Sequence, residues 1–375
     1  MSRPQAYIVS LKYSPGLKKF FVVLGDNLRQ RGFAVTYLLS AKYANGEDPA
    51  GESIDITSAA GTAGILRETA GFIARPGDWS RRCFPEPPDF VCFYNPHPLN
   101  VVLARAIRKN FPQALTAVYF HEPFMPDKAA FGARRAMLIR LVESVQARVV
   151  KNVRALIAPS DYARKKIRVR FPHFPGPVYL APLLARDERS PEMARPAHFS
   201  MIGMANEATG HGDFFGFVNV AAARGGDLRF CVVSSSNLKK YTARLEAAAR
   251  NRVEVINRPS ITDREIDAAI RRSYAVFRLD KSLTQSAVLV DAFRNGTPVI
   301  ARDIPGLRQH VRHKKNGYLV PPALTPDDLW RATGYVRENF EELSRNARAD
   351  FERLYHENNF EKYFSWLIDH FGGNG

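Results

Sequence analysis

Residues 281–322 read KSLTQSAVLVDAFRNGTPVIARDIPGLRQHVRHKKNGYLVPP, and this stretch decides the fold. A polar loop ends at Ser286 and opens a helix, and Gly296-Thr297-Pro298 leads that helix into the apolar strand Val299-Ile300-Ala301. Loop, helix, turn and strand in this order form half of an α/β unit. The first amide groups of a helix have no partner inside it, so a helix that begins in small polar residues predicts an anion site.

The same alternation of strands and helices runs through both halves of the chain. Strands are predicted at Ala6–Leu11, Phe33–Leu39, Phe90–Tyr94, Ala117–Phe120, Ala155–Ala158, His198–Ile202, Leu228–Val233, Val253–Ile256, Ala275–Leu279, Val299–Ala301 and Gly317–Val320. Strands that alternate with helices indicate parallel sheets covered on both faces. Between the halves, Tyr179–Ala197 is rich in Pro, Arg and Glu, and we expect it to be a linker.

The predicted fold is therefore α/β, with two doubly wound, Rossmann-like domains facing a central cleft. A chain of 375 residues is long for one core and supports two domains. We expect the first at 1–185, the second at 186–355, and a helix at 356–375 that packs back on the first.

Composition restricts the partners. The net charge of +17 favours an acidic partner, which could be nucleic acid, an anionic membrane or a phosphorylated substrate; a basic enzyme with solvated charges is the alternative. No recognition helix or aromatic RNA-binding strand is apparent, so we do not expect nucleic acid. Three scattered cysteines, Cys83, Cys92 and Cys231, predict neither disulfides nor a zinc site. No apolar run of about 18 residues predicts a membrane span, and no secretion segment precedes Ser14.

The second half resembles the donor domain of GT-B glycosyltransferases, and among them glycosyltransferase family 4. The residues that carry the resemblance are Asp280-Lys281, Gln285-Ser286-Ala287-Val288-Leu289, the run from Gly296 to Asp303, Pro305-Gly306, and Asn316 to Pro322. The match covers about 40 residues closely and both domains more loosely. It implies a nucleotide-sugar donor, linked to UDP or GDP, held at the start of the helix after Ser286, with no cofactor and no metal.

The donor residues follow from the resemblance and from simple chemistry. Small residues at Ser286 and Ala287, beside Gln285 and Val288, would let a diphosphate approach the helix amides, and Lys281 could reach a phosphate as a point charge. The resemblance implies that Asp291 holds the ribose; a solvated helix residue is the alternative.

One departure from the family pattern concerns the leaving diphosphate. Family members carry an Arg and a Lys after the first donor-domain strand, whereas residues 203–213 contain neither. Charge at a leaving group is a large catalytic term, so either Lys281, Arg258 or Arg278 supplies the charge, or the donor differs, or the activity is weak. Ser234 and Arg258 lie at or just after strand ends that flank the nucleotide in the family.

In the first domain, His121-Glu122-Pro123 follows a buried strand, as in family 4 enzymes. The resemblance implies that His121 contacts the transferred sugar and that Glu122 orders the loop or contacts the acceptor; a loop histidine without a role is the alternative. Asn95, Ser14 and Gly16 are the acceptor or loop candidates, and Ser160 is expected to be a helix N-cap.

Two basic helices remain. Ala133–Arg154 carries an apolar stripe that includes Met137, Leu138 and Leu141, which we interpret as core rather than membrane anchor. Five basic residues crowd into Arg164–Arg170, either as a solvated face or as a contact with an anionic membrane.

Together these features predict a retaining, metal-independent, hexosyl-type glycosyltransferase, active in the cytoplasm at the inner face of the cell membrane. Its acceptor would be a saccharide or a lipid-linked molecule, in bacterial surface polysaccharide or glycolipid synthesis. The alternatives are a catalytically weak GT-B-like partner that binds a glycan or nucleotide sugar, and an inverting GT-B enzyme.

Overall fold

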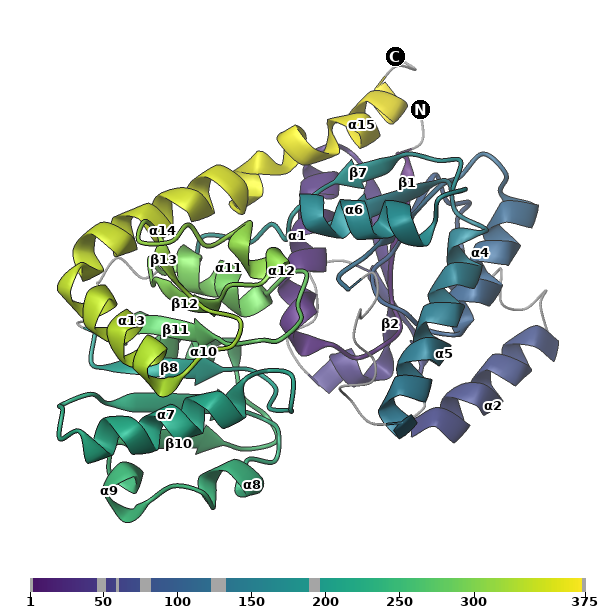
Figure 1. Cartoon of the computed structure of the whole chain (residues 1–375). Helices are drawn as coiled ribbons and strands as arrows, with labels where there is room; N and C mark the ends of the chain where they lie inside the picture. The colour runs from purple at the N-terminus through teal and green to yellow at the C-terminus, as the bar shows by residue number, and fades with distance from the viewer. Residues whose placement is uncertain are drawn as a thin grey trace. The chain divides into compact units, whose positions relative to one another are not determined.

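The structure is a computed structural model, and it describes residues 3–45, 52–58, 61–74, 82–122, 133–188 and 196–372 (Figure 1). The chain forms two compact units, one of Met1–Arg186 with Glu357–Gly375 and the other of Asp187–His356. Each unit contains one parallel sheet, with strand orders β3-β2-β1-β4-β5-β6-β7 and β10-β9-β8-β11-β12-β13. The predicted α/β class with two parallel sheets is confirmed.

Unit 1 contains seven strands and the helices around them. The strands are β1 Gln5–Ser10, β2 Ala34–Ser40, β3 Glu52–Thr57, β4 Phe90–Phe93, β5 Leu115–Tyr119, β6 Ala155–Ala158 and β7 Val178–Leu180. The helices are α1 Pro15–Gln30, η1 Ala41–Asn45, α2 Gly61–Ala74, α4 Leu99–Asn110, α5 Ala133–Val150, α6 Asp161–Arg170, η3 Glu357–Asn359 and α15 Phe360–Gly372.

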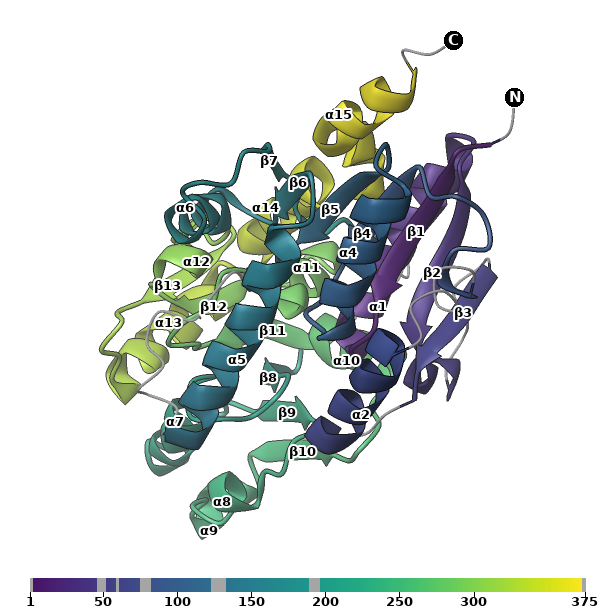
Figure 2. The same ribbon diagram turned by 90° about the vertical axis from the view of Figure 1, so that its right-hand side faces the viewer.

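The core of unit 1 lies between the sheet and the helices α2, α4, α5 and α6, which Figure 2 shows on one side of the strands. Val9 and Val118 from the sheet meet Leu103 of α4 and Ile167 of α6 in one buried cluster. The α15 helix belongs to the same unit. Its Trp366 ring stacks on Tyr179 of β7 with ring centroids 3.9 Å apart.

Unit 2 contains six strands, β8 His198–Ile202, β9 Phe230–Ser234, β10 Val253–Asn257, β11 Ser273–Arg278, β12 Val299–Arg302 and β13 Gly317–Val320. Its helices are α7 His211–Ala223, α8 Lys239–Thr242, α9 Ala247–Arg250, α10 Asp263–Arg271, α11 Ala287–Arg294, α12 Pro305–Arg308, α13 Pro326–Glu338 and α14 Phe340–Leu354. Phenylalanines of α7 and Leu329 of α13 bury one face of the sheet, and α11 packs against α14 near the other.

Three expectations need correction. The predicted linker Tyr179–Ala197 begins in β7, and Leu183 and Leu184 are buried, so its first part is core rather than linker. The strand β3 carries polar residues at a sheet edge, and the periodicity of the sequence did not reveal it. Met137, Leu138 and Leu141 of α5 are exposed, so the first half of the predicted apolar stripe is not core.

None of the described helices is both long enough and apolar enough to cross a membrane. The predicted N-cap at Ser160 is confirmed, because its hydroxyl accepts the Ala163 amide at 3.2 Å.

Candidate functional site

The candidate site lies at the carboxyl edge of the unit 2 sheet, where the loops after β8, β9 and β11 lead to the helices α7, α8 and α11. In open parallel sheets, ligands bind outside the carboxyl ends of the strands, and here the strand order changes direction between β8 and β11. The topology therefore gathers residues that are far apart in sequence, such as Glu207 and Lys281.

The helix α11 begins after Ser286, as the sequence predicts, but the Ser286 hydroxyl already accepts a hydrogen bond from the helix itself. The Ser286 hydroxyl is buried and accepts the Leu289 amide at 3.1 Å, which satisfies one of the first amides of the helix. Ala287 and Val288 are half-buried in the first turn. The remaining amides of that turn are the ones that an anion could reach.

Gln285 precedes this turn and differs from its neighbours. Its side chain is only 8% exposed, and neither its amide nitrogen nor its amide oxygen has a hydrogen-bond partner in the part of the chain that the structure describes. Buried polar atoms are nearly always satisfied, so an unpartnered amide at a helix start indicates a place for a polar ligand or an ordered water.

Asp291 was expected to hold a ribose or to be a solvated helix residue, and the structure places it in an ion pair inside unit 2. It is buried, not solvated, and its carboxylate lies 3.7 Å from Arg294, which is itself held by Asp267 at 2.6 Å. The solvated alternative is wrong, and the ribose role stays a prediction. The ion pair gives Asp291 a packing role inside unit 2.

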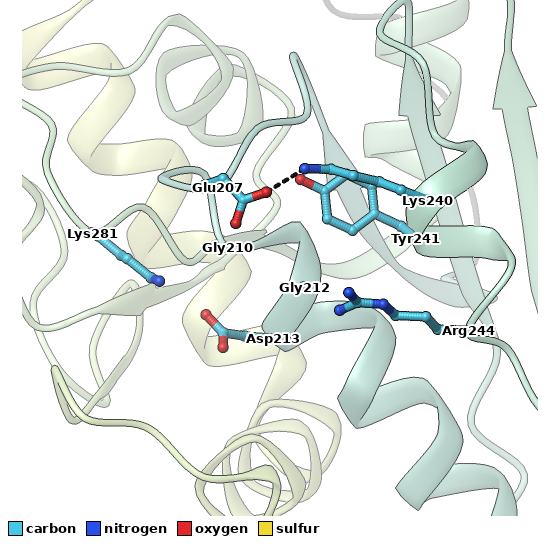
Figure 3. A pocket seen from close by; sticks show the side chains of 8 residues that line it. All are labelled: Glu207, Gly210, Gly212, Asp213, Lys240, Tyr241, Arg244 and Lys281. Carbon is cyan, nitrogen blue, oxygen red and sulfur yellow. Dashed lines mark hydrogen bonds and ion pairs between the residues drawn. The ribbon is translucent and has the colours of Figure 1, made fainter. Parts of the chain in front are cut away.

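A pocket opens at the start of α7 (Figure 3). It is lined by Glu207, Gly210, Gly212, Asp213, Lys240, Tyr241, Arg244 and Lys281. Its volume is ≈ 100 Å³, which suits a phosphate-sized group and is well below the roughly 300–1,000 Å³ of a drug-sized ligand site. Gly212 leaves space over the first turn, since a Cβ there would meet nothing within 4 Å.

The charges of this pocket divide into paired and unpaired groups. Glu207 is paired with Lys240, and Asp213 is paired with Arg302 at 2.6 Å. Among the described residues, no acidic side chain pairs with Lys281 or Arg244, and Figure 3 shows the two pointing inward from opposite sides. An anion between them would meet two cations that form no close ion pair within the described residues, although the charge of Glu207 at the pocket wall interacts with both.

The sequence between 203 and 213 contributes no cation, and the structure shows where nearby cations come from. Arg278 of β11 reaches the end of β8 and donates to the Ile202 carbonyl at 3.2 Å, beside Gly203. Its guanidinium also pairs with buried Asp280 at 2.8 Å, so its charge is largely compensated. Burial raises the pKa of Asp280, and Arg278 opposes that rise.

Lys281 is fixed beside the same loop by its own backbone. Its amide donates to the Ala208 carbonyl at 2.8 Å, which ties the loop after β11 to the loop after β8. The predicted candidates Lys281 and Arg278 are thus brought to this edge. Arg258 does not line the pocket and pairs with Glu265 instead.

Ser234 is buried at the end of β9, where its hydroxyl accepts the Ser236 amide at 3.1 Å. It shapes the turn and does not line the pocket. Lys240 and Arg244 follow this turn, and sequence reasoning missed both. The signal that could have found them is a pair of basic residues spaced four apart, beginning in the first short helix after a buried strand.

His211 begins α7 and is buried, with its Nδ1 2.9 Å from the Thr209 hydroxyl. Burial, helped by the nearby charge of Arg278, lowers the pKa of His211 to about 4. The ring is therefore neutral at physiological pH and cannot replace the missing cation.

In unit 1, His121 follows β5 and lies against the rings of Tyr94 and Tyr119, with ring centroids 4.9 and 4.8 Å away. Burial lowers the pKa of His121 to about 3, so its ring is neutral and suited to a hydrogen bond with a hydroxyl group. Glu122 beside it is half-buried. Their catalytic roles stay predictions.

The remaining unit 1 candidates have structural surroundings. Asn95 is buried, and its amide donates to Ser10 Oγ at 2.8 Å and to the Lys12 carbonyl at 2.7 Å. It fastens the end of β4 to the end of β1, which argues against the predicted place on an open rim. Ser14 donates its amide to the Tyr43 hydroxyl at 2.9 Å, and Gly16 is exposed with open space around it.

Among the residues that the structure describes, no three His, Cys, Asp or Glu side chains gather as a metal site.

Comparison with known proteins identifies the fold and part of the chain. Residues 199–339 match the family described as glycosyl transferases group 1. No curated protein sequence matches the chain. Sucrose-phosphate synthase from Thermosynechococcus elongatus superimposes with a TM-score of 0.74 at 14% identity, covering 100% of both chains.

Two further structures agree. A glycosyltransferase from Rickettsia africae has a TM-score of 0.70 at 12% identity and covers 100% of both chains. HepE from Anabaena, solved with UDP and glucose, has a TM-score of 0.70 at 14% identity over 98% of this chain and 100% of that one. The chain therefore has the GT-B fold, and residues 199–339 form a group 1 glycosyltransferase domain.

Proposed function

We propose that this protein is a glycosyltransferase that moves a sugar from a nucleotide-sugar donor to a saccharide or lipid-linked acceptor. The observation that carries the proposal is the group 1 domain at 199–339, which contains both the α11 start and the cation-lined pocket. HepE, of the same fold, was solved with UDP-glucose, which supports a UDP-linked hexose as the first donor to test.

The leaving diphosphate would take its charge from residues outside 203–213. Among the described residues, Lys281 and Arg244 face the pocket without a close ion pair, and the first amides of α7 lie at its wall. Cationic side chains bind phosphate oxygens with charge-assisted hydrogen bonds, which are about twice as strong as neutral ones. Lys281 also belongs to the loop that leads to Gln285 and the α11 start, so one ligand could use all three.

The finer features follow the family resemblance. We propose a retaining, metal-independent transfer of a hexose, with the neutral ring of His121 contacting the transferred sugar. We also propose family 4 membership, a role in bacterial surface polysaccharide or glycolipid synthesis, and a place in the cytoplasm at the inner face of the membrane. An inverting outcome is the alternative, and NMR of the anomeric proton in the product separates the two.

Binding of UDP, UMP, GDP and GMP by calorimetry tests the donor site. We expect UDP or GDP to bind more tightly than its monophosphate, and Arg244→Gln or Lys281→Gln to weaken diphosphate binding about tenfold each while sparing the monophosphate. Lys239→Gln and Arg264→Gln remove exposed cations that do not line the pocket and serve as matched controls.

Transfer activity is measured by release of nucleoside diphosphate from UDP-glucose and GDP-mannose with a panel of saccharide acceptors. His121→Ala should lower the rate without weakening diphosphate binding. If no nucleoside diphosphate binds better than millimolar, the proposal is wrong.

A second candidate is a catalytically weak partner that binds a nucleotide sugar. The absence of Arg and Lys from 203–213 favours it. Tight diphosphate binding together with no transfer to any acceptor, in wild type and His121→Ala alike, would support this candidate.

A further inference from the structure

The first half of α5 does not pack into the core of unit 1. From Ala133 to Val142 no described side chain is buried, and the first buried residue is Glu143. The helix has 18 residues and is about 27 Å long, whereas β5 before it has 5 residues and spans roughly 17 Å. The helix is therefore longer than the sheet that it covers.

Three large apolar side chains are exposed on this part of α5. Met137 is 73% exposed, Leu138 51% and Leu141 50%. Spacings of three and four residues place Leu141 on the same helix face as the other two. Burying such side chains against water is favourable, so a contiguous exposed group of them indicates an interaction site.

Cations accompany this apolar group. Arg140 and Arg148 are exposed, and Arg148 lies two turns after Leu141 on the same face. The helix α6 also carries exposed Lys165, Arg168 and Arg170, but Arg170 pairs with Glu143 at 3.8 Å, and Glu143 lies about 200° around α5 from Leu141. We call Met137, Leu138, Leu141, Arg140 and Arg148 the α5 face.

The acidic groups on these two helices pair with cations of α6 and not with Arg140 or Arg148. Glu143 is buried, and Asp161 is paired with Arg164 at 2.5 Å. An apolar group flanked by Lys and Arg, with little exposed acid, is the pattern of a helix that lies on an anionic bilayer. A second copy of the chain in a two-fold arrangement would bring these like charges together.

We propose that the α5 face docks on the surface of an anionic lipid bilayer. The three apolar side chains enter the boundary between head groups and acyl chains, and the cations contact lipid phosphates. The inference extends the proposed function, because a lipid-linked acceptor lies in the same bilayer. It does not rest on the sugar chemistry, since docking needs neither donor nor acceptor.

Vesicle flotation of the full chain tests this surface. The protein is mixed with phosphatidylcholine vesicles, or with vesicles in which about one third of the lipid is phosphatidylglycerol, at low and at high salt. Wild type should float with the anionic vesicles, more at low salt than at high salt, and little with phosphatidylcholine alone.

Two variants separate the contributions. Met137→Gln/Leu138→Gln/Leu141→Gln keeps good helix formers and should lower partitioning at least about tenfold. Arg140→Gln/Arg148→Gln should lower partitioning about fivefold per charge on anionic vesicles only. Val255→Gln, at another exposed apolar residue on β10, is the matched control and should float as wild type does.

Circular dichroism and thermal melting show whether each variant is folded. The proposal is overturned if wild type stays unbound with anionic vesicles, or if both variants float as wild type does. A wild-type dimer in light scattering that the triple variant converts to monomer, without flotation, would assign the face to a second copy. Nucleoside diphosphate binding is measured in parallel, so failure of the lipid proposal is distinguished from failure of the donor site.

Discussion

The helices α7 and α11 both begin at the carboxyl edge of the same sheet, yet their starts are built in opposite ways. The α11 start carries the motif, and its buried Ser286 hydroxyl is occupied by the Leu289 amide. The α7 start carries no motif, but Gly210 and Gly212 lie at a pocket with two cations that form no close ion pair among the described residues. The comparison shows that the motif predicted the backbone conformation of a helix start. The open space and the positive charge for a ligand depend on side chains from other elements.

The two glycines at α7 differ as well. Gly210 has φ of +75°, and a Cβ there would lie 2.4 Å from the Leu279 carbonyl oxygen. Gly212, two residues later, has open space. The turn before α7 therefore requires glycine at position 210. At position 212, glycine would be required only if a ligand comes close to the backbone.

The largest expected effect tests this difference. Gly210→Ala should destabilise unit 2 by about 3 kcal/mol or more, because it forces a left-handed backbone and a clash with backbone atoms. Gly212→Ala should instead stabilise α7 by about 0.5–1 kcal/mol while weakening diphosphate binding. Urea unfolding and calorimetry measure both. Equal stability losses for the two alanines would remove the distinction.

The next effect concerns pH. His211 has its pKa lowered to about 4, while an unfolded histidine titrates near 6.5, so the unfolded state binds the proton first as pH falls. The contribution of neutral His211 to the free energy of unfolding is complete above about pH 6.5. As the pH falls toward 4, this contribution decreases by on the order of 3 kcal/mol. Hydrogen exchange of α7 amides at pH 7.5 and 4.5 should show a smaller difference in His211→Asn than in wild type.

His173 is an exposed histidine of unit 1 and gives the control, His173→Asn, which should keep the wild-type pH response of α7. An unchanged response in His211→Asn would assign the acid sensitivity to other buried histidines, such as His310, whose pKa burial lowers to about 4.

The smallest effect is at α11. Ser286→Ala leaves the Leu289 amide without its buried acceptor and should cost about 1 kcal/mol of stability. Because the hydroxyl is already engaged by the helix, diphosphate affinity should change less than it does in Lys281→Gln. A larger loss of affinity in Ser286→Ala than in Lys281→Gln would mean that α11, not the α7 pocket, dominates binding.

Much of the fold could be predicted because strands buried on both faces have continuous apolar sequences. The observed bounds of β8 and β13 are those predicted. The edge strands could not be predicted. The strand β3 has polar, exposed residues, and β7 has only three residues and lies where Pro and Arg suggested a linker.

The charged residues of the pocket at α7 were harder to predict from the sequence, because they come from separate loops. Lys281 was predicted from the motif, but Arg244 becomes its neighbour only when β9 pairs beside β8. Asn95 is a different case: a polar residue at a strand end suggested a ligand contact, and the structure adds a structural role, because its hydrogen bonds hold two strands together.

The chain leaves unit 1 after Arg186 and returns to it at Glu357. The amide of Glu357 donates to the Ala185 carbonyl at 3.1 Å, so the outgoing and returning segments are fastened at the point of exit. During synthesis, the whole of unit 2 emerges before α15 can cover Phe33, Phe90 and Tyr179. Unit 1 therefore cannot complete this aromatic cluster until the last helix of the chain has been made, although most of its residues come first in the sequence.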